Sequence, residues 1–137
     1  MMGIWSGRTP PKQTFNAEAV LLEEADCTEL VRVVGESNYQ DALRAICSSS
    51  KWEEVAFDCL AVLVPEPENP YDENAIMVQV DGQLLGYLSR EDAVAYQGMV
   101  LGLVERGRYL ACQARIAGRG PGSETSNLGV FLKLPPA

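Results

Sequence analysis

The residues best suited to binding chemistry form the segment Asn69-Pro70-Tyr71-Asp72. Pro70 presets the backbone angle that a type I turn requires, and Asn69 can close such a turn by hydrogen bonding to the backbone that follows it. The turn would hold the Tyr71 ring beside the Asp72 carboxylate at the rim of a hairpin. A phenol ring can stack on another flat ring, and a carboxylate accepts hydrogen bonds, so the pair predicts a binding corner.

Several catalytic chemistries are excluded by residue type. The chain contains no histidine, which removes the Ser-His-Asp and Cys-His arrangements. A Gly-x-x-x-x-Gly-Lys-Ser/Thr loop is also absent from the sequence, so an enzyme acting on phosphate anhydrides is not expected. Asp72 and Asn74 have the spacing that opens a calcium loop, but Ile76 and Val80 occupy positions that need oxygen ligands or glycine. We therefore predict no catalytic residues.

The cysteines do not form a metal-binding pattern. Cys27, Cys47, Cys59 and Cys112 contain no Cys-x-x-Cys pair. A zinc site would need all of these widely spaced thiols or borrowed carboxylates. We expect reduced, mostly buried thiols, with no metal and no cofactor.

A length of 137 residues predicts one compact domain. Residues 1–14 are rich in Gly, Pro, Lys and Arg and are predicted to be a flexible arm, which leaves residues 15–137 as the domain. No apolar run approaches the roughly 18 residues of a membrane span, and the first residues lack a signal-peptide core. We expect a cytoplasmic protein without membrane contact.

The charge is unevenly distributed along the chain. The net charge is −8, which argues against a protein that coats nucleic acid. Residues 1–83 carry 5 basic and 15 acidic side chains, whereas residues 84–137 carry 6 and 4. Arginine dominates the later basic group and suits phosphate binding, although a solvated arginine face is the commoner explanation.

Hydrophobic patterning predicts a β-rich fold. Residues from Phe15 to about Glu24 alternate weakly and are compatible with either a first strand or a helical turn. The clearest local structure is a hairpin around an Asp81-Gly82 turn, in which Val80 would face Gln83, Val78 would face Leu85 and Ile76 would face Tyr87. Strands are predicted at Thr28–Val34, Val55–Val64, Ile76–Val80, Gln83–Leu88, Arg108–Ala117 and Leu128–Leu134.

Two helices are predicted between these strands. Ser37 and Gln40 fit a capping box that opens the first helix, which ends in the Ser48–Ser50 run. Ser89 and Asp92 open the second, which stops at Gly107. A glycine-rich mobile loop is expected at Gly118–Ser126. These elements predict a strongly curved antiparallel sheet or small barrel with two helices, and no βαβ pattern supports a parallel sheet.

The chain resembles the HIRAN domain family over roughly Thr28 to Leu134. The resemblance is carried by the segments Asn69-Pro70-Tyr71-Asp72-Glu73-Asn74-Ala75-Ile76, Asp81-Gly82, Gly86-Tyr87-Leu88-Ser89-Arg90-Glu91-Asp92-Ala93, Val33-Val34-Gly35-Glu36-Ser37 and Glu66-Pro67. Members occur fused to helicase-like chromatin and repair proteins and as short stand-alone bacterial chains. The resemblance implies a mainly β, OB-like or SH3-like antiparallel barrel of about six strands with two helices. It also implies a non-catalytic module that holds the 3′-hydroxyl end of single-stranded DNA in repair or replication-fork processing.

The resemblance assigns roles to individual residues. Asp72 would accept a hydrogen bond from the terminal hydroxyl, because a carboxylate repels an internal phosphate and tolerates a donor. Tyr71 and Tyr87 would contact bases. The residues placed on or near end-binding positions are Asn69, Tyr71, Asp72, Tyr87 and Arg90, with Tyr39 and Arg119 as candidates in the two loops where the family's basic and aromatic residues are missing.

Each assignment has a plainer structural alternative. The Asn69–Asp72 segment could serve only as a turn, and Tyr87 could pack across the hairpin on Ile76. Arg90 could be a solvated surface residue, and Tyr39 could belong to a helix face. The alternative function for the whole chain is an adaptor whose acidic surface recruits a helicase or nuclease. The sequence does not fix the oligomeric state or a preference for DNA over RNA.

Overall fold

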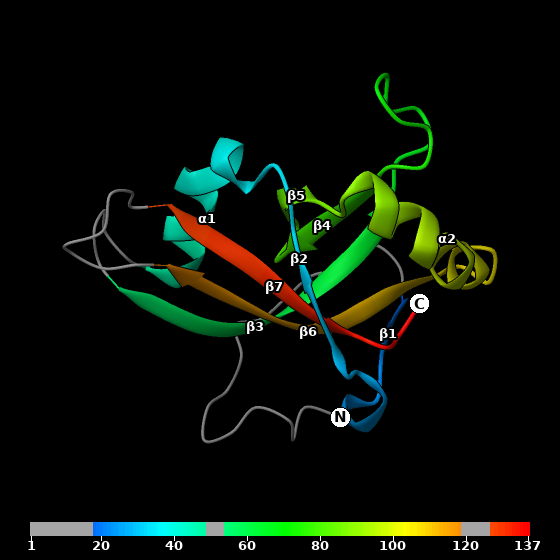
Figure 1. Cartoon of the computed structure of the whole chain (residues 1–137), viewed down its shortest axis with the longest axis horizontal. Coiled ribbons are helices and arrows are strands. Elements are labelled where there is room, and N and C mark those ends of the chain that lie inside the picture. The colour runs from blue at the N-terminus through cyan, green and yellow to red at the C-terminus, as the bar shows by residue number, and fades with distance from the viewer. Residues whose placement is uncertain (1–17, 49–53, 119–126) are drawn as a thin grey trace.

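The computed structural model describes residues 18–48, 54–118 and 127–137 (Figure 1). The predicted arm at 1–14 and Arg119, with nearly all of the predicted mobile loop, lie outside the described residues. The described residues form one sheet of seven strands with two α-helices and two short 3₁₀ helices. In chain order, the elements are β1 (Glu18–Leu21), η1 (Glu24–Asp26), β2 (Glu29–Arg32), η2 (Glu36–Tyr39), α1 (Gln40–Cys47), β3 (Val55–Pro65), β4 (Ile76–Val80), β5 (Gln83–Tyr87), α2 (Arg90–Val104), β6 (Arg108–Gly118) and β7 (Leu128–Leu134).

The sheet runs in the order β2-β7-β6-β3-β4-β5, and every pair along this path is antiparallel. The predicted fold class, mainly β with two helices, is therefore confirmed. The segment from Phe15 to about Glu24, which the sequence left as a strand or a helical turn, contains the strand β1, and β1 pairs with β6 in parallel. β7 pairs with β6 only from Ala114 onward, so the β6 edge at Arg108–Ala111 is open, and β1 covers it.

The two ends of the sheet path meet at one short contact. Val34, just after β2, forms an isolated bridge with Tyr87 at the end of β5, through reciprocal backbone hydrogen bonds of 2.8 and 2.9 Å. The approach is close because β5 carries glycine here: a Cβ on Gly86 would lie 2.6 Å from Val33 Cγ1 and 2.6 Å from the Val34 carbonyl oxygen. The curled sheet is thus brought to a barrel-like closure by a single bridge rather than a continuous ladder.

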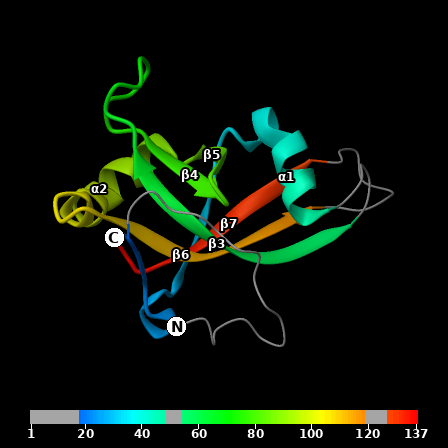
Figure 2. The same cartoon turned by 180° about the vertical axis from the view of Figure 1, so that it is seen from behind.

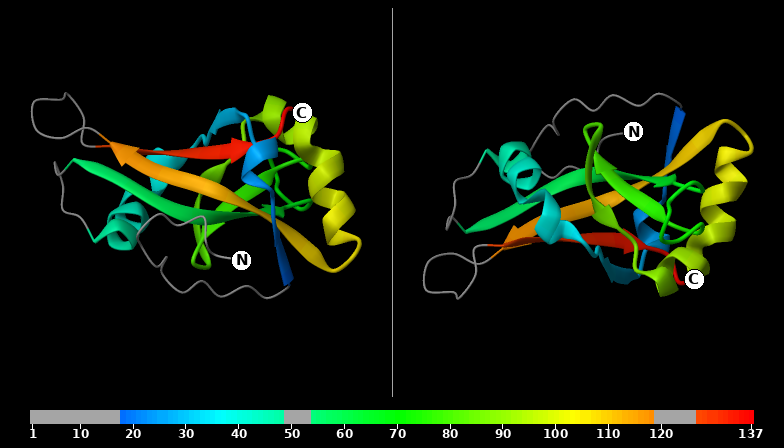
Figure 3. Two further views of the ribbon diagram at one scale, coloured as in Figure 1. Left: turned by 90° about the horizontal axis from the view of Figure 1, so that it is seen from below. Right: turned by 90° about the horizontal axis from the view of Figure 1, so that it is seen from above.

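The core lies inside this curl and is built from alternating strand residues. Ile76, Val78 and Val80 of β4 are fully buried, whereas the intervening Met77 and Gln79 are half-buried. α1 packs on β5 and β7, and α2 packs on β6 and β3. The helices lie at opposite ends of the sheet, as the views from behind, below and above agree (Figures 2 and 3). No helix within the described residues is long and apolar enough to cross a membrane.

The hairpin register differs from the prediction beyond its first pair. Val80 pairs with Gln83 as expected, but a bulge lies between Val78 and Gln79. The expected pairings of Val78 with Leu85 and Ile76 with Tyr87 are therefore wrong, because Val78 pairs with Gly86, and Met77 with Tyr87. A one-residue shift exchanges the two faces of a strand, so the bulge takes Tyr87 off the core face of Ile76 and places it on the rim.

One of the two predicted helix caps is confirmed. The Ser89 side chain accepts a hydrogen bond from the Asp92 backbone at 3.1 Å and opens α2. Ser37 is not the cap of α1: it lies inside η2, and α1 begins at Gln40 without a side-chain cap. The Gln40 amide instead pairs with Leu128 at the start of β7, donating to its carbonyl at 2.9 Å and accepting from its N–H at 2.7 Å.

Candidate functional site

The loop between β3 and β4 projects beyond the rest of the fold (Figures 1 and 2). As the sequence predicts, Asn69 closes the turn: its Oδ1 accepts hydrogen bonds from the backbone N–H groups of Tyr71 at 2.9 Å and Asp72 at 3.1 Å. The loop is anchored where the Glu66 N–H donates to the Ala75 carbonyl at 2.8 Å. The backbone of the candidate corner is therefore held by short hydrogen bonds.

Glu66 is a central residue of this region, but the sequence did not identify it as a candidate site residue. Its Oε1 accepts hydrogen bonds from Asn69 Nδ2 at 2.6 Å and from the Tyr87 hydroxyl at 2.9 Å. Burial raises the pKa of Tyr87 to about 12, and the hydrogen bond to Glu66 adds to this effect. Glu66 thus ties the projecting turn to the end of β5. Its only signal in the sequence is its place in the Glu66-Pro67 pair of the resemblance.

Tyr71 and Asp72 differ in their exposure to solvent. The Tyr71 residue is 82% exposed, although a large aromatic residue gains by burial. Asp72 is half-buried, and its Oδ1 accepts a hydrogen bond from the Asn74 N–H at 2.9 Å. Among the described residues, no donor contacts Asp72 Oδ2. The turn therefore presents an exposed ring one residue before a carboxylate that has a single protein hydrogen bond among the described residues.

Arg90 is brought to the same corner by α2. It is the first residue after the Ser89 cap, a position where the helix dipole disfavours a positive charge. Its Nη2 donates to the Tyr71 carbonyl at 3.1 Å, and the residue is exposed. The guanidinium group is thus directed toward the turn, with donors left over for another ligand.

Tyr39 lies near Tyr87. It is half-buried at the end of η2, which packs against β5, and its charge interaction with Tyr87 contributes to the raised pKa of Tyr87. The structure therefore gathers six of the seven candidate residues at one rim, while Arg119 lies outside the described residues. Ser37 and Asn38, the polar residues of the turn that follows Gly35, are exposed nearby in η2.

The rim is acidic apart from Arg90 and from Arg32, which forms an ion pair with Glu36 at 3.6 Å. Carboxylates around it include Glu36, Glu66, Glu68, Asp72 and Glu73. Such a surface repels a run of phosphates and can hold at most a few. The described residues contain no cluster of three or more His, Cys, Asp or Glu side chains arranged to hold a metal ion.

Comparisons with known proteins point to one family. The family model of the HIRAN domain matches residues 34–121. Among solved structures, the crystal structure of the HIRAN domain of human HLTF is similar to this chain, with 25% sequence identity and a TM-score of 0.37, over 76% of this chain and 73% of that one. A search of the curated proteins finds no match.

Proposed function

This chain belongs to the HIRAN domain family of DNA-binding, non-catalytic modules, and from that membership we propose that it binds the 3′-hydroxyl end of single-stranded DNA. The observation that supports the proposal is the projecting turn, in which the 82% exposed Tyr71 directly precedes Asp72, whose Oδ2 has no hydrogen-bond donor among the described residues. Free 3′ ends arise in DNA repair and replication-fork processing, and we propose one of these as its setting.

Charge explains how the corner would select an end. A terminal hydroxyl donates to Asp72, and a hydrogen bond to a charged acceptor contributes about 1.5–3 kcal/mol. A phosphate in the same place would put two like charges together, and near a protein surface such a pair repels by about 4 kcal/mol at 4 Å. The carboxylate therefore favours a free 3′-hydroxyl over an internal or terminal phosphate.

The other residues divide between contact and support. Tyr71 is free to stack on the terminal base, which contributes roughly 1–3 kcal/mol. Arg90 is placed to take a phosphate on the inner side of the terminal nucleotide. Asn69 acts through the turn, because both ends of its amide are already bonded within the protein. Tyr87 offers its ring to a base while its hydroxyl donates to Glu66.

The test is a fluorescence titration with short oligonucleotides that end in either a 3′-hydroxyl or a 3′-phosphate. The wild type is expected to prefer the hydroxyl by about tenfold or more, which corresponds to 1.4 kcal/mol. Asp72→Asn retains an oxygen for the Asn74 N–H but removes the charge, so it should lose most of this preference.

Glu73→Gln is the matched control, because it makes the same charge change at the exposed neighbouring residue. It should retain the hydroxyl preference. Equal binding of the two oligonucleotides by the wild type would contradict the proposal. No binding even at low salt would also contradict it and would favour the adaptor function, in which the acidic surface recruits a helicase or nuclease.

A further inference from the structure

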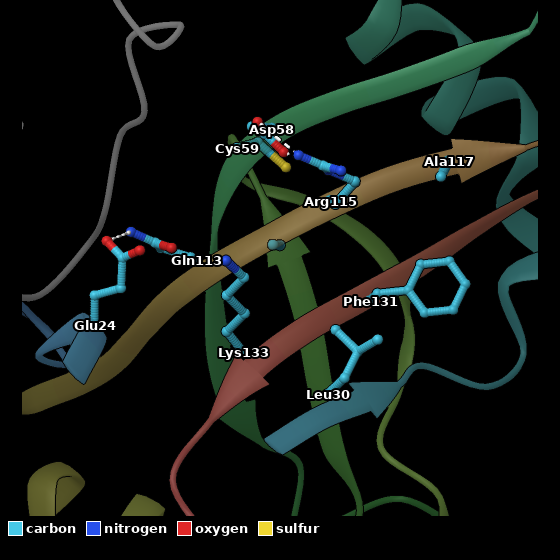
Figure 4. Close-up of a pocket in the computed structure, with 10 residues that line it drawn as sticks. Glu24, Leu30, Asp58, Cys59, Gln113, Arg115, Ala117, Phe131 and Lys133 are labelled. Atoms are coloured by element: carbon cyan, nitrogen blue, oxygen red, sulfur yellow. Dashed lines mark hydrogen bonds and ion pairs between the residues drawn. The ribbon is translucent and has the colours of Figure 1, made fainter. Parts of the chain in front are cut away.

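A groove of about 520 Å³ lies on the outer face of β2, β7, β6 and β3, outside the core (Figure 4). Leu30, Arg115, Phe131 and Lys133 line it. The Leu30 residue is 69% exposed, and Phe131 is half-buried. None of these residues belongs to the corner around Tyr71, so the groove is a separate feature of the surface.

Strand register sets cations beside the aromatic ring. Arg32 pairs with Phe131, and Phe131 pairs with Arg115, so the three side chains form one row across β2, β7 and β6. The Arg32 guanidinium carbon lies 5.7 Å from the centre of the Phe131 ring. In the next outward-facing row, Leu30 pairs with Lys133. A ring flanked by cations is the arrangement that stacks bases and contacts phosphates.

The carboxylates of the groove already have partners. Asp58 accepts two hydrogen bonds from Arg115, at 2.7 and 3.2 Å, and Glu24 accepts one from Gln113 at 3.2 Å. Figure 4 shows both pairs at the margins of the groove. Lys133, by contrast, makes no ion pair within the part of the chain that the structure describes. Arg32, next to the groove, is ion paired with Glu36 at 3.6 Å, so Lys133 is the cation that the groove offers to a ligand.

The outward side chains of β2 connect the groove with the Tyr71 rim. Leu30, Arg32 and Val34 are exposed in alternation with the buried Val31 and Val33. Val34 is also the residue that bridges Tyr87 at the rim. Four residues of extended strand span about 13 Å, so a bound strand that passes Tyr87 from the Tyr71 end can continue along β2 into the groove.

From these observations we infer that the groove binds the internal part of a single-stranded nucleic acid. Phe131 supplies a stacking face, and Lys133 contacts a phosphate. The inference extends the proposed function and rests on it, because the 3′ end would be seated at Tyr71. A nucleic acid is favoured because the Phe131 ring and the Lys133 ammonium group lie together on a surface that leads to the end site, and an acidic peptide is the competing occupant.

The experiment compares a 3-nucleotide and a 12-nucleotide DNA strand, both with a free 3′-hydroxyl, by fluorescence anisotropy over a salt series. The wild type should bind the longer strand at least tenfold more tightly. Phe131→Leu should reduce affinity for the 12-mer about tenfold through lost stacking. Lys133→Glu should reduce it at least fivefold and lower the salt slope by at least about one. Neither variant should change binding of the 3-mer by more than about twofold.

Arg106→Glu is the matched control, because it makes the same charge change at an exposed residue in the turn after α2, outside the groove. It should leave the length dependence unchanged. If the wild type prefers a 3′-hydroxyl but binds both lengths equally, the groove inference fails and the proposed function stands. If the length dependence is present but hydroxyl and phosphate ends bind equally, the proposed function fails.

A third arm tests the competing occupant. A poly-glutamate peptide should compete with the 12-mer no better than its charge at the same ionic strength predicts. If the peptide displaces the 12-mer from the wild type at equimolar concentration, and Lys133→Glu abolishes that displacement, the groove is a peptide site and the inference is overturned.

Discussion

The barrel closure and the projecting turn are built in opposite ways. At the closure, Gly86 meets Val33 and Val34 with no room for another atom, and the hydrogen bonds join backbone to backbone. In the turn, side chains hold the backbone, and the ring of Tyr71 is left in solvent. Close packing resists any change of volume, whereas directed hydrogen bonds tolerate changes at residues that do not take part in them.

The difference separates the residues that maintain the fold from those placed for recognition. Tyr87 alone belongs to both regions: its backbone makes the closing bridge and its hydroxyl donates to Glu66 in the turn. We therefore expect the cost of substitution in unfolding free energy to fall from the closure, through Glu66 and Tyr87, to Tyr71.

Gly86→Ala should have the largest effect. Its Cβ would lie 2.6 Å from the Val34 carbonyl oxygen, so the bridge to β5 must move apart. We expect a loss of about 3 kcal/mol in unfolding free energy, measured by denaturant titration. Gly102→Ala is the control, because the same change in open space within α2 should stabilise the protein by about 0.5–1 kcal/mol. Equal effects of the two substitutions would contradict the close packing of the closure at Gly86.

Glu66→Ala should have the next largest effect. It removes the acceptor for both Asn69 and Tyr87, so the turn loses its tie to β5. We expect a loss of about 1–2 kcal/mol in unfolding free energy, together with weaker binding of oligonucleotides. Glu68→Ala, at an exposed neighbouring residue, should stay within about 0.5 kcal/mol of the wild type. If Glu66→Ala changes neither the unfolding free energy nor oligonucleotide binding, the turn does not depend on Glu66.

Tyr87→Phe should cost about 1 kcal/mol near neutral pH through the lost hydrogen bond to Glu66. The raised pKa of about 12 means that the folded protein favours the protonated phenol, so its contribution is complete below the ordinary tyrosine pKa of about 10. It is lost as the pH rises through 12. The difference between wild type and variant, measured by denaturant titration, should therefore shrink from pH 10 to pH 12. A constant difference would contradict the assigned cause.

Tyr71→Ala should have the smallest effect on folding. The residue is 82% exposed, and the turn uses only its backbone groups, so unfolding free energy should change by less than about 0.5 kcal/mol. Affinity for a DNA strand with a 3′-hydroxyl should fall roughly tenfold in the titration described above. Pro70→Ala, at the exposed residue just before it, is a control for altered turn stiffness. Unfolding of Tyr71→Ala would mean that the residue is structural.

Local patterns in the sequence predicted most elements but not their long-range contacts. Ser89 caps α2 as expected, because its partner Asp92 is three residues away. The predicted hairpin register was wrong because β4 contains a bulge between Val78 and Gln79. Val78 pairs with Gly86, which lies against Val33, and this contact between distant segments has no local signal in the sequence. The prediction that Ser37 caps α1 was wrong for a similar reason, since the Gln40 side chain at the start of α1 bonds to Leu128, 88 residues away.

The candidate site shows the same division. The Asn69 turn was predictable because every bond that closes it spans two or three residues. Glu66 was missed as a site residue because it reaches Tyr87, which is 21 residues away. The outer groove was not predictable, because Arg32, Phe131 and Arg115 come together only through strand pairing.

The double hydrogen bond between the Gln40 amide and Leu128 has a consequence for how this protein could be engineered. A side-chain amide that pairs with both peptide groups of one residue acts as a one-residue neighbouring strand. It fixes the first residue of β7 to α1, in addition to the pairing of Leu128 with Gly118. An engineered variant of this protein should therefore retain Gln40, because Gln40→Leu would leave both peptide groups of Leu128 without this partner.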